Sequence, residues 1–162
     1  MSVLKWGLSG LVALVLLAVL AGQMGLLQGR APAGLGVKDG RLAPPSGTDN
    51  SVSSQAGLWP GHPQHEAAAI APLALAGDGA ATLQRLHDAV AAMPGARIVV
   101  FDGDYLRAEF TTPVMKFTDD AEFWLDRAAG VVQVRSASRL GQRDFGTNRK
   151  RVEAIRARLQ GG

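Results

Sequence analysis

An uninterrupted apolar run near the N-terminus, Trp6 to Leu27, is the feature that most constrains how this chain can fold. It is 22 residues long, and one serine and one glutamine are its only clearly polar members. A helix rises about 1.5 Å per residue, so a helix of this length can cross a hydrocarbon core of about 30 Å. Lys5 and Trp6 would then lie at one interface, where basic and aromatic anchors are common. The run predicts a single transmembrane anchor or signal-anchor over residues 1–28.

Two other interpretations of this run are open. A cleaved signal peptide would have its apolar core at Leu8–Leu20 and its cleavage site near Val19-Leu20-Ala21. A buried helix of a soluble protein is the third possibility. The chain contains no cysteine, so a lipoprotein signal is excluded, as are disulfides, thiolate metal sites and cysteine nucleophiles.

The orientation of the anchor depends on the charges beside it. Arg30, Lys38 and Arg41 follow the run, whereas Lys5 precedes it, so the positive-inside rule alone would keep the soluble part in the cytoplasm. A very short tail before a signal-like apolar core favours the opposite orientation. We expect a single-pass protein of the cell membrane whose soluble domain is extracytoplasmic, in the periplasm.

Residues 29–64 have the composition of a tether. They include seven glycines, five prolines and four serines, which leaves too little apolar surface for a core. Val52, Leu58 and Trp59 are exceptions, and they predict that the end of this segment docks on the domain that follows. Two histidines and a glutamate near this end could ligate a metal, but no third histidine or thiolate is close, so we expect no metal and no cofactor.

The domain proper is expected over residues 65–162, and its first element is a helix. Asp78 can cap the first turn of this helix, and Pro94-Gly95 ends it. The apolar residues that recur at helical spacing between these two signals are Leu83, Leu86, Val90 and Met93.

Alternation with a period of two follows, and it predicts two hairpins. Strands at Arg97–Phe101 and Tyr105–Thr112 flank Asp102-Gly103, which is a strong hairpin turn signal. Strands at Ala121–Asp126 and Val131–Ser138 flank a second turn.

A closing helix completes the predicted domain. Phe145, Val152 and Leu159 mark one face of it, with Asn148 and Ile155 between them. The order of elements predicts an α+β fold with an antiparallel sheet of about four strands in two hairpins. An N-terminal and a C-terminal helix would pack on one face of the sheet, and the single transmembrane helix would precede the domain.

The alternation also assigns side chains to the two faces of the sheet. If Asp126 lies opposite Val131, then Glu122 lies opposite Arg135. The face that carries this pair is polar, and it is either solvated or covered by the docking end of the tether. The side chains expected to face the helices include Leu106, Ala108 and Phe110.

The stretch from Arg135 to Arg149 carries the residues best suited to bind a ligand. Its arginines offer planar donor forks, its serines and asparagine add hydroxyl and amide groups, and two glycines let a backbone come close. Such a junction at a helix N-terminus suits an anion such as a carboxylate or a phosphate. The candidate binding residues are Tyr105, Asp119, Asp120, Glu122, Arg135, Ser136, Ser138, Arg139, Asp144, Asn148 and Arg149.

A purely structural network and a catalytic site are the alternatives to a ligand site here. Buried guanidinium groups need charged partners, and the acidic side chains within residues 119–122 form the one cluster that the strand register brings near. The ion pairs expected from a structural network join Glu122 to Arg135, and Asp119 or Asp120 to Arg139 or Arg149.

The charges of the chain are distributed unevenly. Residues 139–162 carry seven basic and two acidic side chains, a net charge of +5, whereas residues 28–138 carry nine basic and twelve acidic ones, a net charge of −3. The basic excess is modest, and a membrane-tethered domain rarely meets DNA. We therefore expect no nucleic-acid partner, and favour the membrane, with anionic lipid headgroups or an envelope protein as possible contacts. The pattern specifies no oligomeric state.

Three motifs resemble a known family. The stretches "NSVSSQ", "DDAEFWLD" and "VRSASRLGQRDFGTNRKRVEAIRARL" closely resemble the family of domains of unknown function numbered 1499 (DUF 1499), over approximately Pro44 to Leu159. Ser51 stands where that family usually has a cysteine, so thiol chemistry is impossible in this chain. The resemblance implies a bacterial or plastid-associated protein, often with a targeting or membrane segment, and it brings no established activity.

These observations predict a non-catalytic binding or structural module of the cell envelope. Its polar junction of arginine, aspartate and asparagine side chains would bind an anionic ligand, a lipid or a partner. The alternative is an envelope hydrolase that uses the cluster of Asp119, Asp120 and Arg135.

Overall fold

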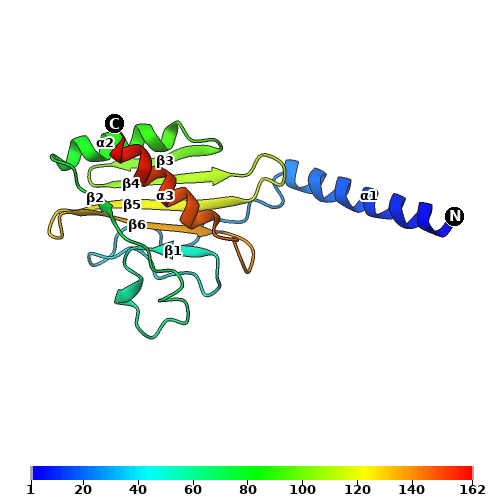
Figure 1. The fold of residues 1–162 in the computed structure, drawn as a ribbon, viewed down its shortest axis with the longest axis horizontal. Helices are drawn as coiled ribbons and strands as arrows, with labels where there is room; N and C mark the ends of the chain where they lie inside the picture. Colours follow the sequence, from blue (N-terminus) through cyan, green and yellow to red (C-terminus); the bar gives the residue numbers. More distant parts are fainter. Residues whose placement is uncertain (1, 162) are drawn as a thin grey trace.

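The computed structural model of the chain describes residues 2–161. Figure 1 shows a sheet with two helices packed against it, and a long N-terminal helix that projects from one end of the molecule. The elements are α1 (Ser2–Gln23), β1 (Ser51–Ser53), the 3-10 helix η1 (Ala56–Leu58), β2 (Leu73–Ala74), α2 (Gly79–Ala91), β3 (Ala96–Asp102), β4 (Tyr105–Thr111), β5 (Thr118–Asp126), β6 (Val131–Ser138) and α3 (Thr147–Gln160).

The helix α1 is long and apolar enough, over Leu4–Gln23, to cross a membrane, and it is exposed along most of its length, whereas Gly22 near its C-terminal end is buried. Its length and composition suit either a membrane anchor or a signal sequence. Its C-terminal end is tied to the domain, because Gln23 Nε2 donates hydrogen bonds to the carbonyl oxygens of Pro113, at 3.2 Å, and Val114, at 2.7 Å.

The sheet is antiparallel, with the strand order β1-β6-β5-β4-β3, and β2 also pairs with β6. The predicted α+β class is confirmed, but the sheet has six strands rather than about four. The two additional strands, β1 and β2, are three and two residues long. They pair with the two ends of β6 and come from segments that precede α2. Strands this short contain too few residues to display a period of two, which is why the sequence pattern does not reveal them.

The predicted hairpins and their register are confirmed. Asp126 lies opposite Val131, and Glu122 lies opposite Arg135. The strand β5 begins at Thr118, three residues before the start expected from the alternation. The second turn lies where it was predicted, whereas the first is formed by Gly103 and Asp104, one position after the predicted Asp102-Gly103, because Asp102 pairs with Tyr105 at the end of β3.

The helix α2 begins and ends where its capping residues predict. Asp78 Oδ2 accepts a hydrogen bond of 2.9 Å from the backbone N–H of Ala81. After the helix ends at Ala91, Gly95 adopts a φ of +74°, and a Cβ at this position would collide with the carbonyl oxygen of Thr111. Glycine is therefore required where the chain turns from α2 into β3.

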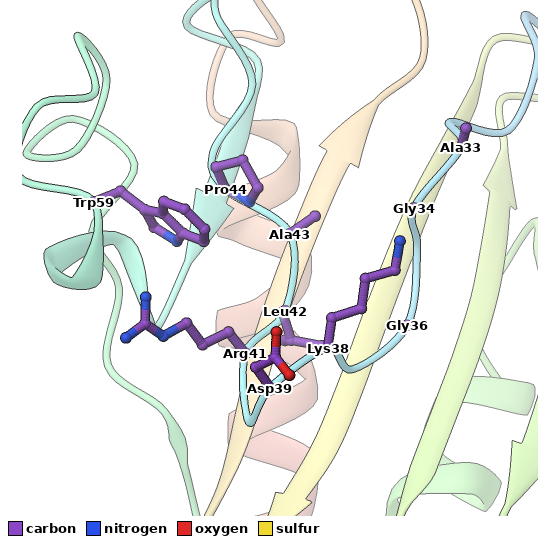
Figure 2. A pocket seen from close by; sticks show the side chains of 10 residues that line it. All are labelled: Ala33, Gly34, Gly36, Lys38, Asp39, Arg41, Leu42, Ala43, Pro44 and Trp59. Atoms are coloured by element: carbon purple, nitrogen blue, oxygen red, sulfur yellow. The ribbon is translucent and has the colours of Figure 1, made fainter.

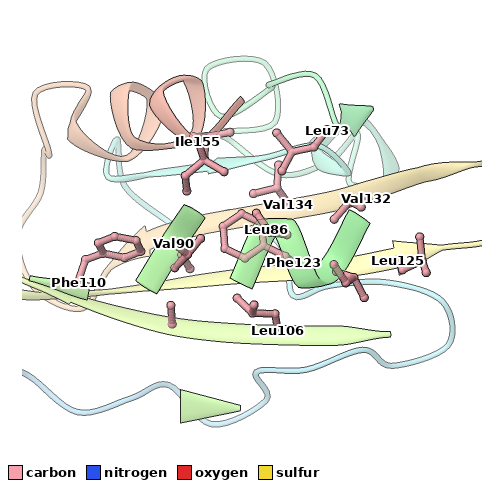
Figure 3. Packing of buried hydrophobic residues seen from close by; sticks show 14 of the residues in the cluster. Leu73, Leu86, Val90, Leu106, Phe110, Phe123, Leu125, Val132, Val134 and Ile155 are labelled. Atoms are coloured by element: carbon pink, nitrogen blue, oxygen red, sulfur yellow. The ribbon is translucent and has the colours of Figure 1, made fainter. Parts of the chain in front are cut away.

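The core lies between the helices and one face of the sheet (Figure 3). Leu86 and Val90 of α2 and Ile155 of α3 pack onto side chains from β4, β5 and β6. Fully burying such a side chain contributes about 1.5–3 kcal/mol, so this single layer is the main source of stability. The strand residues in the core include Leu106, Ala108, Phe110, Phe123, Leu125, Val132 and Val134.

One residue assigned to the closing helix was placed wrongly by the sequence pattern. Phe145 was expected to share a buried face with Val152, but it lies outside α3, and its exposed fraction is 87%. The helix begins at Thr147 because Gly146 adopts a left-handed backbone conformation, with a φ of +77°. The turn of chain before it directs Phe145 away from the core.

The second face of the sheet is covered rather than solvated. Residues 33–59, which we call the covering segment, contain buried Leu42 and the strand β1. The backbone N–H of Gly36 donates to Glu122 Oε1 at 2.7 Å, and the carbonyl oxygen of Pro44 accepts from Arg135 Nε at 3.0 Å. Contact with the sheet thus starts well before the apolar end of the segment that was expected to dock.

Candidate functional site

The structure divides the predicted junction between the two faces of the sheet. Asp119 and Asp120 are neighbours on β5, so their side chains point to opposite faces, and the same holds for Arg135 and Ser136 on β6. The single site expected from the sequence is therefore two networks. The covered-face network contains Tyr105, Asp120, Glu122, Arg135 and Arg139, and the helix-face network contains Asp119, Ser136, Ser138, Asp144 and Asn148.

Glu122 is at the centre of the covered-face network, and its exposed fraction is 0%. Its Oε1 accepts hydrogen bonds from Gly36 N–H, at 2.7 Å, and from Tyr105 Oη, at 2.8 Å. Its Oε2 accepts from Arg135 Nη1 at 3.4 Å, which confirms the ion pair predicted across the hairpin. Burial, together with the neighbouring carboxylate of Glu122, raises the pKa of Tyr105, so this phenol stays protonated and donates.

Asp120 holds the second ion pair of this face. It is buried, and its two oxygens accept from Arg139 Nε at 2.8 Å and Arg139 Nη2 at 2.9 Å, a bidentate geometry. Arg107 adds a longer contact of 3.3 Å to Asp120, and Glu109 accepts from Arg139 at 2.6 Å. The hydrogen bond to Asp120 raises the pKa of the Arg139 guanidinium. The predicted pairing of Arg139 with this acidic cluster is confirmed.

Asn148 is at the centre of the helix-face network, and its exposed fraction is also 0%. Its Oδ1 accepts from Ser136 Oγ at 2.6 Å and from Arg151 Nη1 at 2.6 Å. Its Nδ2 donates to Ser138 Oγ at 3.0 Å and to Asp144 Oδ2 at 2.8 Å. One amide thus joins the start of α3 to the end of β6.

Arg151 also belongs to the helix-face network, although it is not among the binding residues predicted from the sequence. It pairs with Asp119 at 2.5 Å, and its guanidinium lies 4.5 Å from the centroid of the Phe110 ring. Arg151 follows Asn148 by three positions on a helix, so the two side chains share a face, and this spacing is a signal that the sequence contains. Arg149 belongs to neither network, because it donates to the carbonyl oxygens of Ala67 and Ala69.

Both networks satisfy their own polar groups, and this limits what they can do chemically. Asp119, Asp120 and Arg135 have no common surface, since the sheet separates the two carboxylates and each carboxylate is ion-paired. Across residues 2–161, no group of three or more histidine, cysteine or acidic side chains is placed to hold a metal ion. The arrangement is suited to fixing the sheet, the covering segment and α3 relative to one another.

The two networks predict a loss of stability in acid. Burial by itself raises the pKa of Asp144 and of Glu109. Hydrogen bonds outweigh this effect: Asp144 accepts from Asn148 and Gly146, and Glu109 accepts from Arg139 and Arg97. The pKa values of both carboxyl groups therefore lie below their ordinary range. A carboxyl group whose pKa is lower in the folded state stabilises the fold above the unfolded-state pKa of about 4, and this stabilisation is lost as the pH falls through the folded-state value.

We therefore expect the melting temperature of the full chain in detergent to be steady between about pH 7 and pH 5 and to fall below about pH 4. Circular dichroism across this range measures it. Asp144→Asn should flatten part of the acid loss, because the neutral amide has no proton to take up. A melting temperature that rises between pH 5 and pH 3 would contradict the assignment.

A pocket of about 570 Å³ lies outside both networks, within the covering segment, between residues 33–44 and Trp59 (Figure 2). Arg41 extends toward Trp59, and its Cζ lies 5.9 Å from the centroid of the indole ring. Lys38 extends to the other end of the pocket, where its Nζ lies beside Gly34. Buried Leu42 and its neighbours Ala43 and Pro44 form the lining between the two cations.

Trp59 supplies a polar group that the protein leaves unused. Its Nε1 is buried and has no hydrogen-bond partner. Among the side chains that the structure describes, Asn50 Oδ1 is the only other buried polar atom without a partner. Buried donors without partners are rare in proteins, and each requires an explanation. Lys38 and Arg41 lie in the same region of the chain as Trp59. Within residues 2–161, neither of them forms a salt bridge.

The sequence pattern did not identify this pocket, although it contains a signal for it. Lys38 and Arg41 exchange both backbone hydrogen bonds, and Asp39 and Gly40 between them have φ values of 51° and 70°. Positive φ at both central residues is the requirement of a type I′ hairpin turn, for which Asp-Gly is a preferred sequence. The segment with the composition of a tether thus contains a local hairpin that presents two cations.

Comparison with known proteins gives one family. A family described as "Protein of unknown function (DUF1499)" matches residues 41–159, which include both networks, Arg41 and Trp59. Neither curated proteins nor solved structures provide a match to this chain.

Proposed function

We propose, on the premise that this chain belongs to the DUF1499 family, that it is a membrane-anchored, non-catalytic module of the cell envelope that binds a small amphipathic anion. The helix α1 would hold the domain at the membrane, and the pocket between residues 33–44 and Trp59 would hold the ligand. The covered-face network would hold the lining in place through the hydrogen bonds of Glu122 to Gly36 and of Arg135 to Pro44. The soluble domain would lie in the periplasm.

The unused indole N–H of Trp59 is the observation that carries this proposal. Because Nε1 is closed off from solvent, a bound acceptor oxygen would satisfy it after a rotation of the indole ring, and the guanidinium of Arg41 beside the same ring would add a charge-assisted hydrogen bond. A phosphate or carboxylate group supplies such oxygens. The apolar lining between Arg41 and Lys38 favours a ligand that also carries a hydrophobic part, although Asp39 at the rim disfavours a highly charged one.

We expect phenyl phosphate to bind the full chain saturably in detergent, and Arg41→Gln to weaken this binding at least about tenfold. A hydrogen bond to a charged group is worth about 1.5–3 kcal/mol, and 1.4 kcal/mol corresponds to a factor of ten in affinity. Trp59→Phe, which keeps a ring but removes the N–H donor, should weaken binding by a smaller factor. Isothermal titration calorimetry measures all three affinities.

Arg158→Gln is the matched control for charge, because Arg158 is exposed on α3, outside the residues that line the pocket. It should bind phenyl phosphate as the unmodified chain does. The proposal fails if the unmodified chain shows no saturable binding, or if Arg41→Gln and Arg158→Gln reduce the affinity equally, since the effect would then be one of overall charge.

A further inference from the structure

The end of the domain from which α1 projects has an unusual surface. It is formed by two loops, residues 112–117 between β4 and β5 and residues 139–146 between β6 and α3. The helix α1 packs closely on the first loop, because a Cβ on Gly22 would meet the carbonyl oxygen of Met115 at 2.6 Å. Hydrogen bonds from Gln23 to the same loop fix this contact. The two loops therefore lie at the level where α1 ends.

Large apolar side chains are exposed on both loops. Phe145 has an exposed fraction of 87%, and Val114, Phe117 and Leu140 are exposed as well. A single exposed apolar side chain needs no explanation, but a group of them on one end of a molecule marks an interaction surface. Phe117, Leu140 and Phe145 also line a common pocket of about 320 Å³, so they form one surface.

The backbone holds two residues of these loops in an unfavourable conformation. Phe145 has a φ of 52° and Lys116 a φ of 58°, in the left-handed region that bulky side chains rarely adopt. Such conformations are unfavourable and persist where the surrounding structure imposes them, often at functional sites. In this case the result is that an aromatic ring is held outside the core and points into solvent.

We propose that this end of the domain rests in the interfacial region of the lipid bilayer, so that the loops at residues 112–117 and 139–146 form a second membrane contact beside α1. Phe117, Leu140 and Phe145 would enter the boundary between headgroups and acyl chains. Lys116 and Arg143 would stay at the level of the headgroups, where long basic side chains are favourable. This inference rests on the membrane anchor of the proposed function.

The opposite end of the domain has different chemistry, which supports a single orientation. Its two hairpin turns carry the exposed ion pair between Asp104 and Arg127, at 2.6 Å, and the small residue Ala128. Among the residues that the structure describes, the large exposed apolar side chains include none from these turns at 103–104 and 127–130. Phe101, which lies shortly before the first turn, is partly exposed, and its ring lies 4.8 Å from the ring of His87. A domain held by its apolar loops would therefore direct this polar end away from the bilayer.

The absence of cysteine allows a direct test of depth in the membrane. Phe145→Cys, Leu140→Cys, Ala128→Cys and Leu14→Cys are each labelled with bimane in the full chain and reconstituted into phosphatidylcholine vesicles with phosphatidylglycerol. Quenching by lipids that carry a spin label near the headgroup or along the acyl chain is then measured. We expect quenching by shallow spin labels at positions 145 and 140 to be several-fold stronger than at position 128. We expect deep quenching at position 14.

The four positions separate the possible failures. Quenching at position 14, with positions 145 and 140 no more quenched than 128, would overturn the second membrane contact and leave the anchor in place. No quenching at position 14 would remove the anchor, and the second contact with it. Substitution of Phe145 could itself abolish the membrane contact. Leu140→Cys retains Phe145 and therefore reports on the contact with the phenylalanine in place. Melting temperatures equal to that of the unmodified chain establish that each labelled variant is folded.

Discussion

Replacing Glu122 by glutamine is expected to lower the free energy of unfolding by about 3–5 kcal/mol, because it leaves a buried guanidinium without its charged partner. The amide can still accept hydrogen bonds from Gly36 N–H and Tyr105 Oη through its remaining oxygen. Its NH₂ group, however, would face Arg135 Nη1, a donor against a donor. Urea denaturation of the full chain in detergent, followed by circular dichroism, measures the change.

A second variant shows whether the unpaired charge causes the loss. Arg135→Met combined with Glu122→Gln removes the guanidinium and keeps an acceptor for Gly36 and Tyr105, so this pair should be more stable than Glu122→Gln alone. Asp104→Asn breaks the exposed ion pair with Arg127 and should change stability little, since solvent screens that pair. If Glu122→Gln leaves stability unchanged, the network is not structural, and its arginines would be available for a ligand.

The parts of the fold that the sequence predicts are those decided by neighbouring residues. The alternation in β4 to β6 specifies the hairpin of β5 and β6, its register and the pairing of Glu122 with Arg135, and the Asp102-Gly103 signal locates the first hairpin to within one residue. Capping by Asp78 places α2 correctly for the same reason. Each of these features depends on side chains within a few positions of one another, where turn and capping preferences are strong.

The parts that were missed depend on contacts between distant segments. The strands β1 and β2 exist because β6 offers them an edge, and β1 lies more than 80 positions before the residues it pairs with, as in Ser53 opposite Arg135. The pocket at Trp59 likewise requires the covering segment to fold back over the sheet. No local pattern encodes such a contact, although the hairpin turn at Asp39-Gly40 would have revealed one piece of it.

The division of the candidate site into two networks could have been derived from the sequence. Alternation already places Ser136 on the face opposite to Arg135, and the same rule separates Asp119 from Asp120. The end of β6 and the turn after it therefore do not present one surface. Which arginine would reach Asp119 was not derivable in the same way, because Arg151 approaches from a helix whose packing depends on the whole core.

Replacing Asn148 by leucine is expected to be the second most destabilising change, with a loss of about 2–5 kcal/mol. The substitution removes the acceptor of Ser136 Oγ and of Arg151 Nη1, and the donor to Ser138 Oγ, at a position that is fully buried. Each buried polar group left without a partner costs about 1–3 kcal/mol. The gain from the larger apolar side chain is smaller, since its surroundings are polar.

Lys150→Ala is the matched control, because Lys150 is exposed in the first turns of the same helix and should change stability by no more than about 0.5 kcal/mol. Hydrogen exchange shows where the structure is weakened. Loss of the Asn148 amide should reduce the protection of backbone amides first at the start of α3 and at the end of β6, since Asn148 links these two elements. Uniform loss of protection over the whole domain, or a stability equal to that of the Lys150 control, would mean that the helix is held by Val152 and Ile155 alone. The helix-face network would then be dispensable for the fold, and its hydroxyl and amide groups would need another explanation.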